Sequence, residues 1–200
     1  MQHDTKELIA SLDAQVQNER RQREAQQEEA NRRHNERLAE EARHVRRHRL
    51  VNLVVSKRPA EGEESVTFHV PSAGCCGSRC RGFLADRSSR WAAIILHPWG
   101  VLGGDMFNPN VVGCLLACAD AGLTTLRFNF RCTLGNGRAA AADLRGACAF
   151  MRSLDSPPER VVVIGYSYGG MVAADVCPDL EDVGAFAMVA RACSAQRRRP

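Results

Sequence analysis

The stretch that decides the fold is Val161-Val162-Val163-Ile164-Gly165-Tyr166-Ser167-Tyr168-Gly169-Gly170. Four apolar, mostly β-branched residues lead directly into the pattern Gly-x-Ser-x-Gly, and small residues follow it. This order predicts a buried strand, a sharp turn that carries a serine, and then a helix. The glycines have a physical role, because the serine on such a turn adopts strained backbone and the strand and helix must approach each other closely. We therefore predict that Ser167 is a nucleophile whose hydroxyl stands above the sheet edge, where a substrate can reach it.

The composition is that of an ordinary soluble domain with enough apolar residues to bury a core. The chain has 200 residues, of which 44% are hydrophobic and 25% charged, and its net charge of +4 is too small to indicate a nucleic-acid partner. Its nine cysteines are odd in number and several fall in predicted core elements, so we interpret them as reduced thiols. The sequence shows neither a secretory signal nor a run that predicts a membrane span. We therefore predict a cytoplasmic protein.

The N-terminal region differs from the rest, because residues 4–49 are rich in Glu, Arg, Gln and Ala and lack Gly and Pro. Opposite charges recur four residues apart, as in Glu29 and Arg33, which favours a helix. Apolar residues stop after Val16 and resume only at Leu38, so the seam of a coiled coil is not sustained. We favour a solvated, charge-stabilised helix, with a weak coiled coil or a partner-binding helix as the alternative. The predicted domains are a charged helix over 1–50, a linker over 51–64 and a globular domain over 65–200.

Strands and helices alternate through the globular domain. We expect a hairpin of short strands over 65–70 and 81–87, and a strand over 91–96 whose continuous apolar run indicates burial on both faces. The later expected elements are a helix over 110–121, a strand over 123–130, a helix over 138–154, the strand and helix around Ser167, and a buried strand over 183–190. This alternation is typical of a doubly wound parallel sheet, in which sites lie beyond the carboxyl ends of the strands.

Three cysteines in a predicted loop, Cys75, Cys76 and Cys80, invite comparison with a zinc site. Adjacent thiols without a matching second pair of Cys or His give poor spacing for tetrahedral coordination. We therefore predict no metal and no cofactor.

Three further segments strengthen the interpretation of the serine motif. They are His97-Pro98, then Gly103-Gly104-Asp105-Met106-Phe107-Asn108-Pro109, then Leu126-Arg127-Phe128-Asn129-Phe130-Arg131. Together with the serine motif, these segments in this order resemble those of the α/β-hydrolase superfamily. Within it they resemble small intracellular hydrolases related to dipeptidyl-peptidase-like and serine-aminopeptidase-like enzymes. The resemblance covers roughly residues 65–190. It implies a three-layer α/β fold with a mostly parallel sheet, and hydrolysis of an ester, thioester or amide bond in a small-molecule or peptide substrate.

The resemblance also implies roles for individual residues. Ser167 would be the nucleophile, and the backbone N–H of Tyr168 would be one donor of the oxyanion hole. The second donor would follow the strand over 91–96, and because Pro98 has no N–H the candidate is Trp99. Arg131 would line the site.

His97 would also line the site, at a strand end next to the serine. We expect it to shape the oxyanion loop and to hydrogen-bond the backbone there, because the superfamily places its base elsewhere. A role for His97 as a substitute base is the weaker interpretation. Asp105 and Asn108 are expected to cap their loop rather than to catalyse.

The largest departure from the family pattern concerns the base. The superfamily's order is Ser, then Asp or Glu, then His, yet all six histidines of this chain precede Ser167. In addition, Trp99-Gly100 stands where the family has a second His-Pro, and Arg131-Cys132-Thr133-Leu134-Gly135 where it has Arg-Gly-x-Gly. We therefore expect an α/β-hydrolase fold that is incomplete at its C-terminus and inactive as this 200-residue chain.

Two other hypotheses remain open. In the first, the protein is a non-catalytic, hydrolase-like interaction protein that acts through its N-terminal helix, by self-association or by binding a partner. The strand over 183–190 would then form an exposed apolar sheet edge. In the second, a partner chain supplies the missing strands and the base.

Overall fold

The computed structural model of the chain describes residues 2–70, 78–133 and 137–189, with side chains from residue 17 onward except that of residue 19. It divides into two compact units, Met1–His48 and Arg49–Pro200, which are described one at a time below. The predicted loop that contains Cys75 and Cys76 lies outside the described residues.

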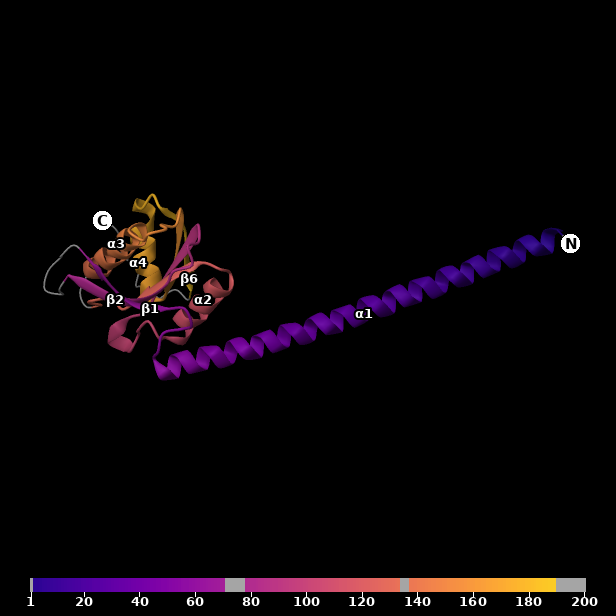
Figure 1. Cartoon of the computed structure of the whole chain (residues 1–200), viewed down its shortest axis with the longest axis horizontal. Helices are drawn as coiled ribbons and strands as arrows, with labels where there is room; N and C mark the ends of the chain where they lie inside the picture. The colour runs from indigo at the N-terminus through magenta and orange to yellow at the C-terminus, as the bar shows by residue number, and fades with distance from the viewer. Residues whose placement is uncertain (1, 71–77, 134–136, 190–200) are drawn as a thin grey trace, which may run out of the picture. The chain divides into compact units, whose positions relative to one another are not determined.

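The first unit is part of helix α1 (Gln2–Ser56), so the predicted N-terminal helix is confirmed (Figure 1). All side chains described between residues 17 and 48 are exposed. Glu29 and Arg33 form one of the predicted ion pairs. Arg20 and Glu24 form a further pair at 3.2 Å, which is not among the predicted ones. Such pairs support a helix that buries no apolar face over the side chains described between residues 17 and 48. None of the helices in the described part of the chain is both long enough and apolar enough to span a membrane.

Helix α1 continues to Ser56, into the segment 51–64 that the sequence predicts to be a linker. This part of the helix belongs to the second unit, where Leu50 approaches Gly113 and Arg49 lies 3.5 Å from Asp120. The predicted boundary at residue 50 therefore falls inside a helix.

The second unit is built on a six-stranded sheet in the order β1-β2-β4-β3-β5-β6. Strand β2 is antiparallel to both neighbours, and β4, β3, β5 and β6 run parallel. The strands are β1 (Glu64–His69), β2 (Arg79–Ala85), β3 (Trp91–Leu96), β4 (Thr124–Phe128), β5 (Arg160–Tyr166) and β6 (Val183–Val189). The predicted hairpin and the mostly parallel sheet are both confirmed.

Helices cover both faces of the sheet and make three layers (Figure 1). Helices α3 (Arg138–Arg152) and α4 (Tyr168–Val176) pack on one face, and α2 (Pro109–Asp120) packs on the other. Strand β3 contributes Ile94 and Leu96 to the first core and Ala93 and Ile95 to the second. A strand that feeds two cores must be apolar at consecutive positions, which is why the run over 91–96 does not alternate. Trp91, at its start, is nevertheless 48% exposed.

Strand β6 is correctly predicted in type but not in burial. Phe186 and Met188 are 40% and 46% exposed, and the strand is exposed from Gly184 to Met188. Among the described strands it pairs with β5 alone, so it lies at an edge of the sheet. An apolar run carries no information on whether a neighbour covers the strand, and for this reason the prediction of burial was wrong.

Candidate active site

The turn between β5 and α4 holds Ser167 in unusual backbone. Its φ of 52° and ψ of −109° fall where a non-glycine residue is strained. The Ser167 N–H donates to the carbonyl of Val189 at 3.1 Å, and its own carbonyl accepts from the N–H of Met171 at 3.2 Å. The hydroxyl caps no helical N–H and makes no hydrogen bond within the described part of the chain. The backbone is thus fixed on both sides, while the hydroxyl remains available.

Two glycines, Gly165 and Gly169, allow strand β5, helix α4 and the end of β3 to pack closely at this turn. A Cβ added at Gly165 would lie 2.4 Å from backbone atoms of Gly169 and Gly170. A Cβ added at Gly169 would lie 2.7 Å from Leu96 Cβ and 2.8 Å from the His97 carbonyl oxygen. The close approach of strand and helix predicted from the glycines is confirmed, and the start of α4 also rests on the end of β3.

The segment after β3 forms a turn that is held by hydrogen bonds within itself and by a hydrogen bond to Thr133. Its Trp99 carbonyl accepts from the N–H groups of Leu102 and Gly104, both at 3.1 Å. The Trp99 indole Nε1–H donates to the carbonyl of Thr133 at 2.6 Å. Within the described residues, the backbone N–H groups of Trp99 and Tyr168 donate no hydrogen bond. Two N–H groups are therefore unused, one on each of two segments in mutual contact.

His97 is occupied by the backbone at both ring nitrogens. Nδ1 lies 2.6 Å from the carbonyl oxygen of Pro98, and the N–H of Phe130 donates to Nε2 at 3.0 Å. Because a carbonyl can only accept and an N–H can only donate, the proton is on Nδ1 and the ring is neutral. The ring is 2% exposed, and burial lowers the pKa of His97. Both nitrogens are therefore engaged with backbone groups rather than with Ser167.

Aromatic contacts fix these groups further. The Phe130 ring packs against His97 with centroids 4.7 Å apart and against Tyr168 at 5.7 Å. Phe128 lies beneath Phe130 at 5.5 Å and joins it to the core. The end of β4 thus holds both the histidine and the residue that follows the serine.

Arg131 is buried in an ion pair with Asp143 of α3. Its backbone N–H donates to Asp143 Oδ2 at 2.9 Å, its Nε donates to Oδ1, and the two side chains are 4% and 0% exposed. Arg131 therefore lies beneath the site instead of presenting its charge to a substrate. Burial first, and then the Asp143 charge, raise the pKa of the Cys80 thiol to about 12. Sequence reasoning missed Asp143, although an acid between Ala140 and Leu144 on the buried face of a helix indicates a buried ion pair.

The loop before α2 is capped by its own polar side chains. Asp105 Oδ1 accepts from the N–H of Phe107 at 2.9 Å, and Asn108 Oδ1 accepts from that of Asn110 at 3.0 Å. Asn129 Oδ1 accepts from the N–H of Met106 at 2.8 Å and joins the loop to the end of β4. The predicted capping roles of Asp105 and Asn108 are confirmed.

A second buried ion pair, also missed from sequence, supports the same loop. Arg127 of β4 donates to Glu63 at 2.9 and 2.6 Å and to the carbonyl of Met106 at 3.1 Å. Both side chains are almost completely buried, and the guanidinium carbon lies 4.9 Å from the Phe107 ring centroid. Arg127 thus holds β4, the segment before β1 and the loop before α2 together.

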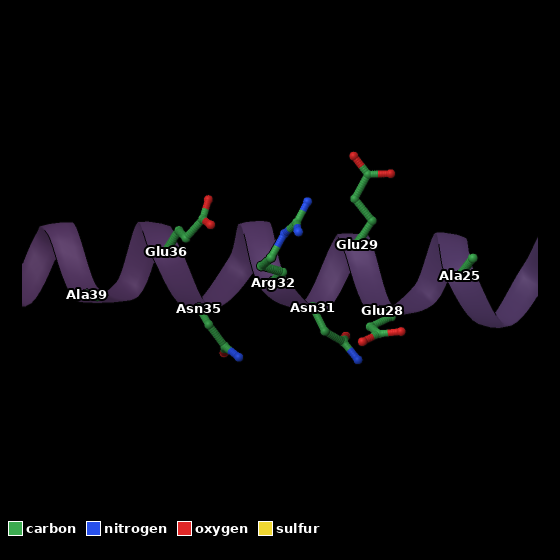
Figure 2. Close-up of a pocket in the computed structure, with 8 residues that line it drawn as sticks. All are labelled: Ala25, Glu28, Glu29, Asn31, Arg32, Asn35, Glu36 and Ala39. Carbon is green, nitrogen blue, oxygen red and sulfur yellow. The ribbon is translucent and has the colours of Figure 1, made fainter.

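Neither the hollow on helix α1 nor any group of metal-ligating side chains in the described residues forms a candidate site. The hollow in Figure 2 is lined by residues of helix α1 alone, which project from one exposed helix, so no second element encloses a ligand. Its residues are Ala25, Glu28, Glu29, Asn31, Arg32, Asn35, Glu36 and Ala39. Within the described ranges, no three His, Cys, Asp or Glu side chains gather as metal ligands.

The chain matches no family model and no curated protein, but its fold is found among solved structures. One is a protein of unknown function from Agrobacterium tumefaciens, proposed to be an α/β hydrolase, with 28% identity, a TM-score of 0.55, and 62% of this chain and 59% of that one covered. A lidless α/β serine hydrolase from Xanthomonas campestris has 24% identity, a TM-score of 0.53, and 65% and 63% covered. An α/β serine hydrolase homologue from Coxiella burnetii has 24% identity, a TM-score of 0.56, and 67% and 65% covered.

These likenesses identify the second unit as an α/β-hydrolase fold and support the α/β-hydrolase superfamily. The chain spans less than two thirds of the length of each of the three neighbours. At these levels of identity the fold is what is shared.

Proposed function

We propose that the protein is a serine hydrolase of the α/β-hydrolase type, with Ser167 as the nucleophile for an ester, thioester or amide bond. The observation that carries this proposal is the positive φ of Ser167 at a tightly packed strand-to-helix turn. Strain of this kind persists only where the surrounding structure imposes it, and it is concentrated at functional sites. The serine hydrolase descriptions of the neighbours from Xanthomonas campestris and Coxiella burnetii support the same reaction. The substrate would be a small molecule or peptide, and the location cytoplasmic.

The unused N–H groups of Tyr168 and Trp99 would form the oxyanion hole. Attack by the Ser167 hydroxyl on a carbonyl places negative charge on the carbonyl oxygen, which backbone donors fixed beforehand stabilise. The loss of one such donor costs about 2.7–4 kcal/mol in the transition state. His97 would act as a positioning residue, because its Nδ1 proton and Nε2 lone pair hold the turn of Trp99 against the end of β4.

The base is the part of the machinery that the described residues lack. All histidines precede Ser167 in the sequence, and His97 has both nitrogens bonded to backbone. Without a base the serine is an ordinary alcohol, and in a serine protease this loss lowers kcat on the order of a million-fold. We therefore propose that the 200-residue chain binds and positions a substrate but turns it over very slowly.

Labelling with a fluorophosphonate probe, read by intact-protein mass spectrometry, tests the nucleophile. We expect slow labelling of the full chain at one site, its loss in Ser167→Ala, and its retention in Ser156→Ala, which removes an exposed serine from the loop before β5. Labelling that persists in Ser167→Ala would mean that another residue reacts. A chain that is folded but never labelled would favour the interaction hypothesis.

That second hypothesis, a non-catalytic protein acting through helix α1, draws on the exposure of every side chain described between residues 17 and 48. A helix with charge on all sides either remains solvated or meets a partner through ion pairs. Sedimentation of the full chain at low and high salt measures its self-association, because ion pairs between exposed groups are screened by salt. A monomer under both conditions would exclude self-association through this helix.

A further inference from the structure

An exposed apolar patch lies on the turn that follows β3. Trp99, Val101 and Leu102 are 41%, 52% and 80% exposed, and the last two belong to the short 3₁₀ helix η1 (Gly100–Leu102). Adjacent large apolar side chains in water are unfavourable, and a cluster of them marks a binding surface more often than a lone exposed residue does. These three residues are called the Trp99 patch below.

The turn that carries the Trp99 patch is held by hydrogen bonds. The N–H of Leu102 donates to the Trp99 carbonyl at 3.1 Å, and that of Gly103 donates to the Gly100 carbonyl at 3.0 Å. The indole is tied to the Thr133 carbonyl, and a Cβ added at Gly100 would lie 2.8 Å from Thr133 Oγ1. An aromatic surface that is already fixed loses little entropy when a ligand binds.

The turn that carries the patch begins at the same edge of the sheet as the turn that carries the proposed nucleophile. Strands β3 and β5 pair in parallel with Leu96 opposite Gly165, so the chain leaves β3 at the same edge of the sheet where Ser167 follows β5. The start of α4 touches Leu96 and His97 through Gly169. A group joined to Ser167 is therefore next to the turn that carries the patch.

Two charged side chains near this turn are paired with groups of opposite charge. Asp105 pairs with Lys57 at 2.7 Å, and Arg131 pairs with Asp143 in the interior. His97 is neutral in the tautomer that its two hydrogen bonds require. An uncharged apolar ligand gains from contact with such a surface, whereas a charged ligand would lose water without gaining a partner.

We infer that the Trp99 patch binds the aliphatic acyl group of the substrate, so that medium-chain acyl esters are preferred over acetyl esters. The inference rests on the proposed function, because it makes the patch the acyl-binding part of the Ser167 site.

Tryptophan fluorescence tests the inference without requiring turnover. The chain has two tryptophans, so Trp91→Phe leaves Trp99 as the single reporter, and Ser167→Ala in the same chain removes any reaction. We expect methyl octanoate, but not methyl acetate, to shift Trp99 emission to shorter wavelength in a saturable way. Leu102→Ser in that background should weaken binding about tenfold, a fraction of what full burial of a leucine side chain provides. Val55→Ser removes an apolar side chain of similar exposure, 77%, and should leave binding unchanged.

Competition then connects the patch to the serine. In the chain with Ser167 intact, methyl octanoate should slow fluorophosphonate labelling, and Leu102→Ser should relieve that effect. No emission shift, or equal effects of Leu102→Ser and Val55→Ser, would overturn the inference. Saturable binding that leaves labelling unchanged would also overturn it, because the ligand would then lie away from Ser167. Saturable, Leu102-dependent binding to a chain that is never labelled would support the apolar site and refute the proposed nucleophile.

Discussion

Replacement of Gly165 by alanine tests whether the packing of β5 against α4 holds the strained serine. The added Cβ would lie 2.4 Å from backbone atoms of Gly169 and Gly170, whereas ordinary contact begins at 3.4 Å. Strand and helix must therefore separate by about 1 Å, because backbone cannot turn aside as a flexible side chain does. Overpacking costs about 1–3 kcal/mol and occasionally more, and we expect Gly165→Ala at or above the upper end of that range. The same movement should abolish labelling of Ser167.

Gly113→Ala in helix α2 is the matched control. Its added Cβ would make ordinary contact, 3.5 Å, with Leu50 Cδ1, and alanine is favoured over glycine inside a helix by about 0.5–1 kcal/mol. Urea unfolding followed by tryptophan fluorescence measures both variants in the second unit, which contains Trp91 and Trp99. We expect opposite signs for the two substitutions. A cost below about 0.5 kcal/mol for Gly165→Ala would refute the packing argument.

Two further predictions concern buried polar groups and use the same urea assay. Glu63→Gln should destabilise the protein by about 3–5 kcal/mol, because it leaves the buried charge of Arg127 without its partner. The double variant Glu63→Leu with Arg127→Met should cost less than Glu63→Gln alone, because it removes both charges. Equal costs for the two would contradict this reasoning. Burial lowers the pKa of His97 from its ordinary 6.5. Just below pH 6.5 the unfolded chain therefore binds a proton at this histidine, whereas the folded chain does not. The contribution of His97 to stability should be complete above pH 6.5 and fall as the pH drops below it, by at most about 1.4 kcal/mol per pH unit. His97→Asn should show a shallower slope, and the same slope in both proteins would show that His97 is not responsible.

The parts of the fold that the sequence predicts well are those set by local periodicity. The apolar run of β3 and the buried stripe Ala140, Leu144, Ala147 and Met151 of α3 each depend on neighbours in the same element, so a window of ten to fifteen residues contains the signal. Strand β6 has the same kind of run, yet it is exposed, because burial depends on which strand lies beside it.

The buried ion pairs could not be predicted in the same way. Glu63 and Arg127 are 64 residues apart in the sequence, and only the antiparallel addition of β1 and β2 to the sheet brings the segment before β1 near β4. The sequence predicts that Arg131 lines the site, but its side chain is buried in an ion pair with Asp143 of the next helix. Nothing in the residues next to Arg131 indicates this partner. The direction of these buried charged side chains thus depends on partners distant in the sequence, which the local sequence pattern does not reveal.

In this chain the backbone geometry of Ser167, the proposed nucleophile, does not depend on a base. The contacts that fix Ser167 come from Gly165, Gly169, Leu96 and Val189, all within the described second unit. None of them involves a histidine ring, because the His97 side chain is directed to Pro98 and Phe130. The strained backbone of Ser167 and the hydrogen bonds of the turn at Trp99 should therefore persist whether or not a base is present. It follows that ligand binding at the Trp99 patch and the stability effect of Gly165→Ala report on the site even in a chain without turnover. A variant that lost both ligand binding at the Trp99 patch and labelling of Ser167 would instead indicate that the turn between β5 and α4 fails to form.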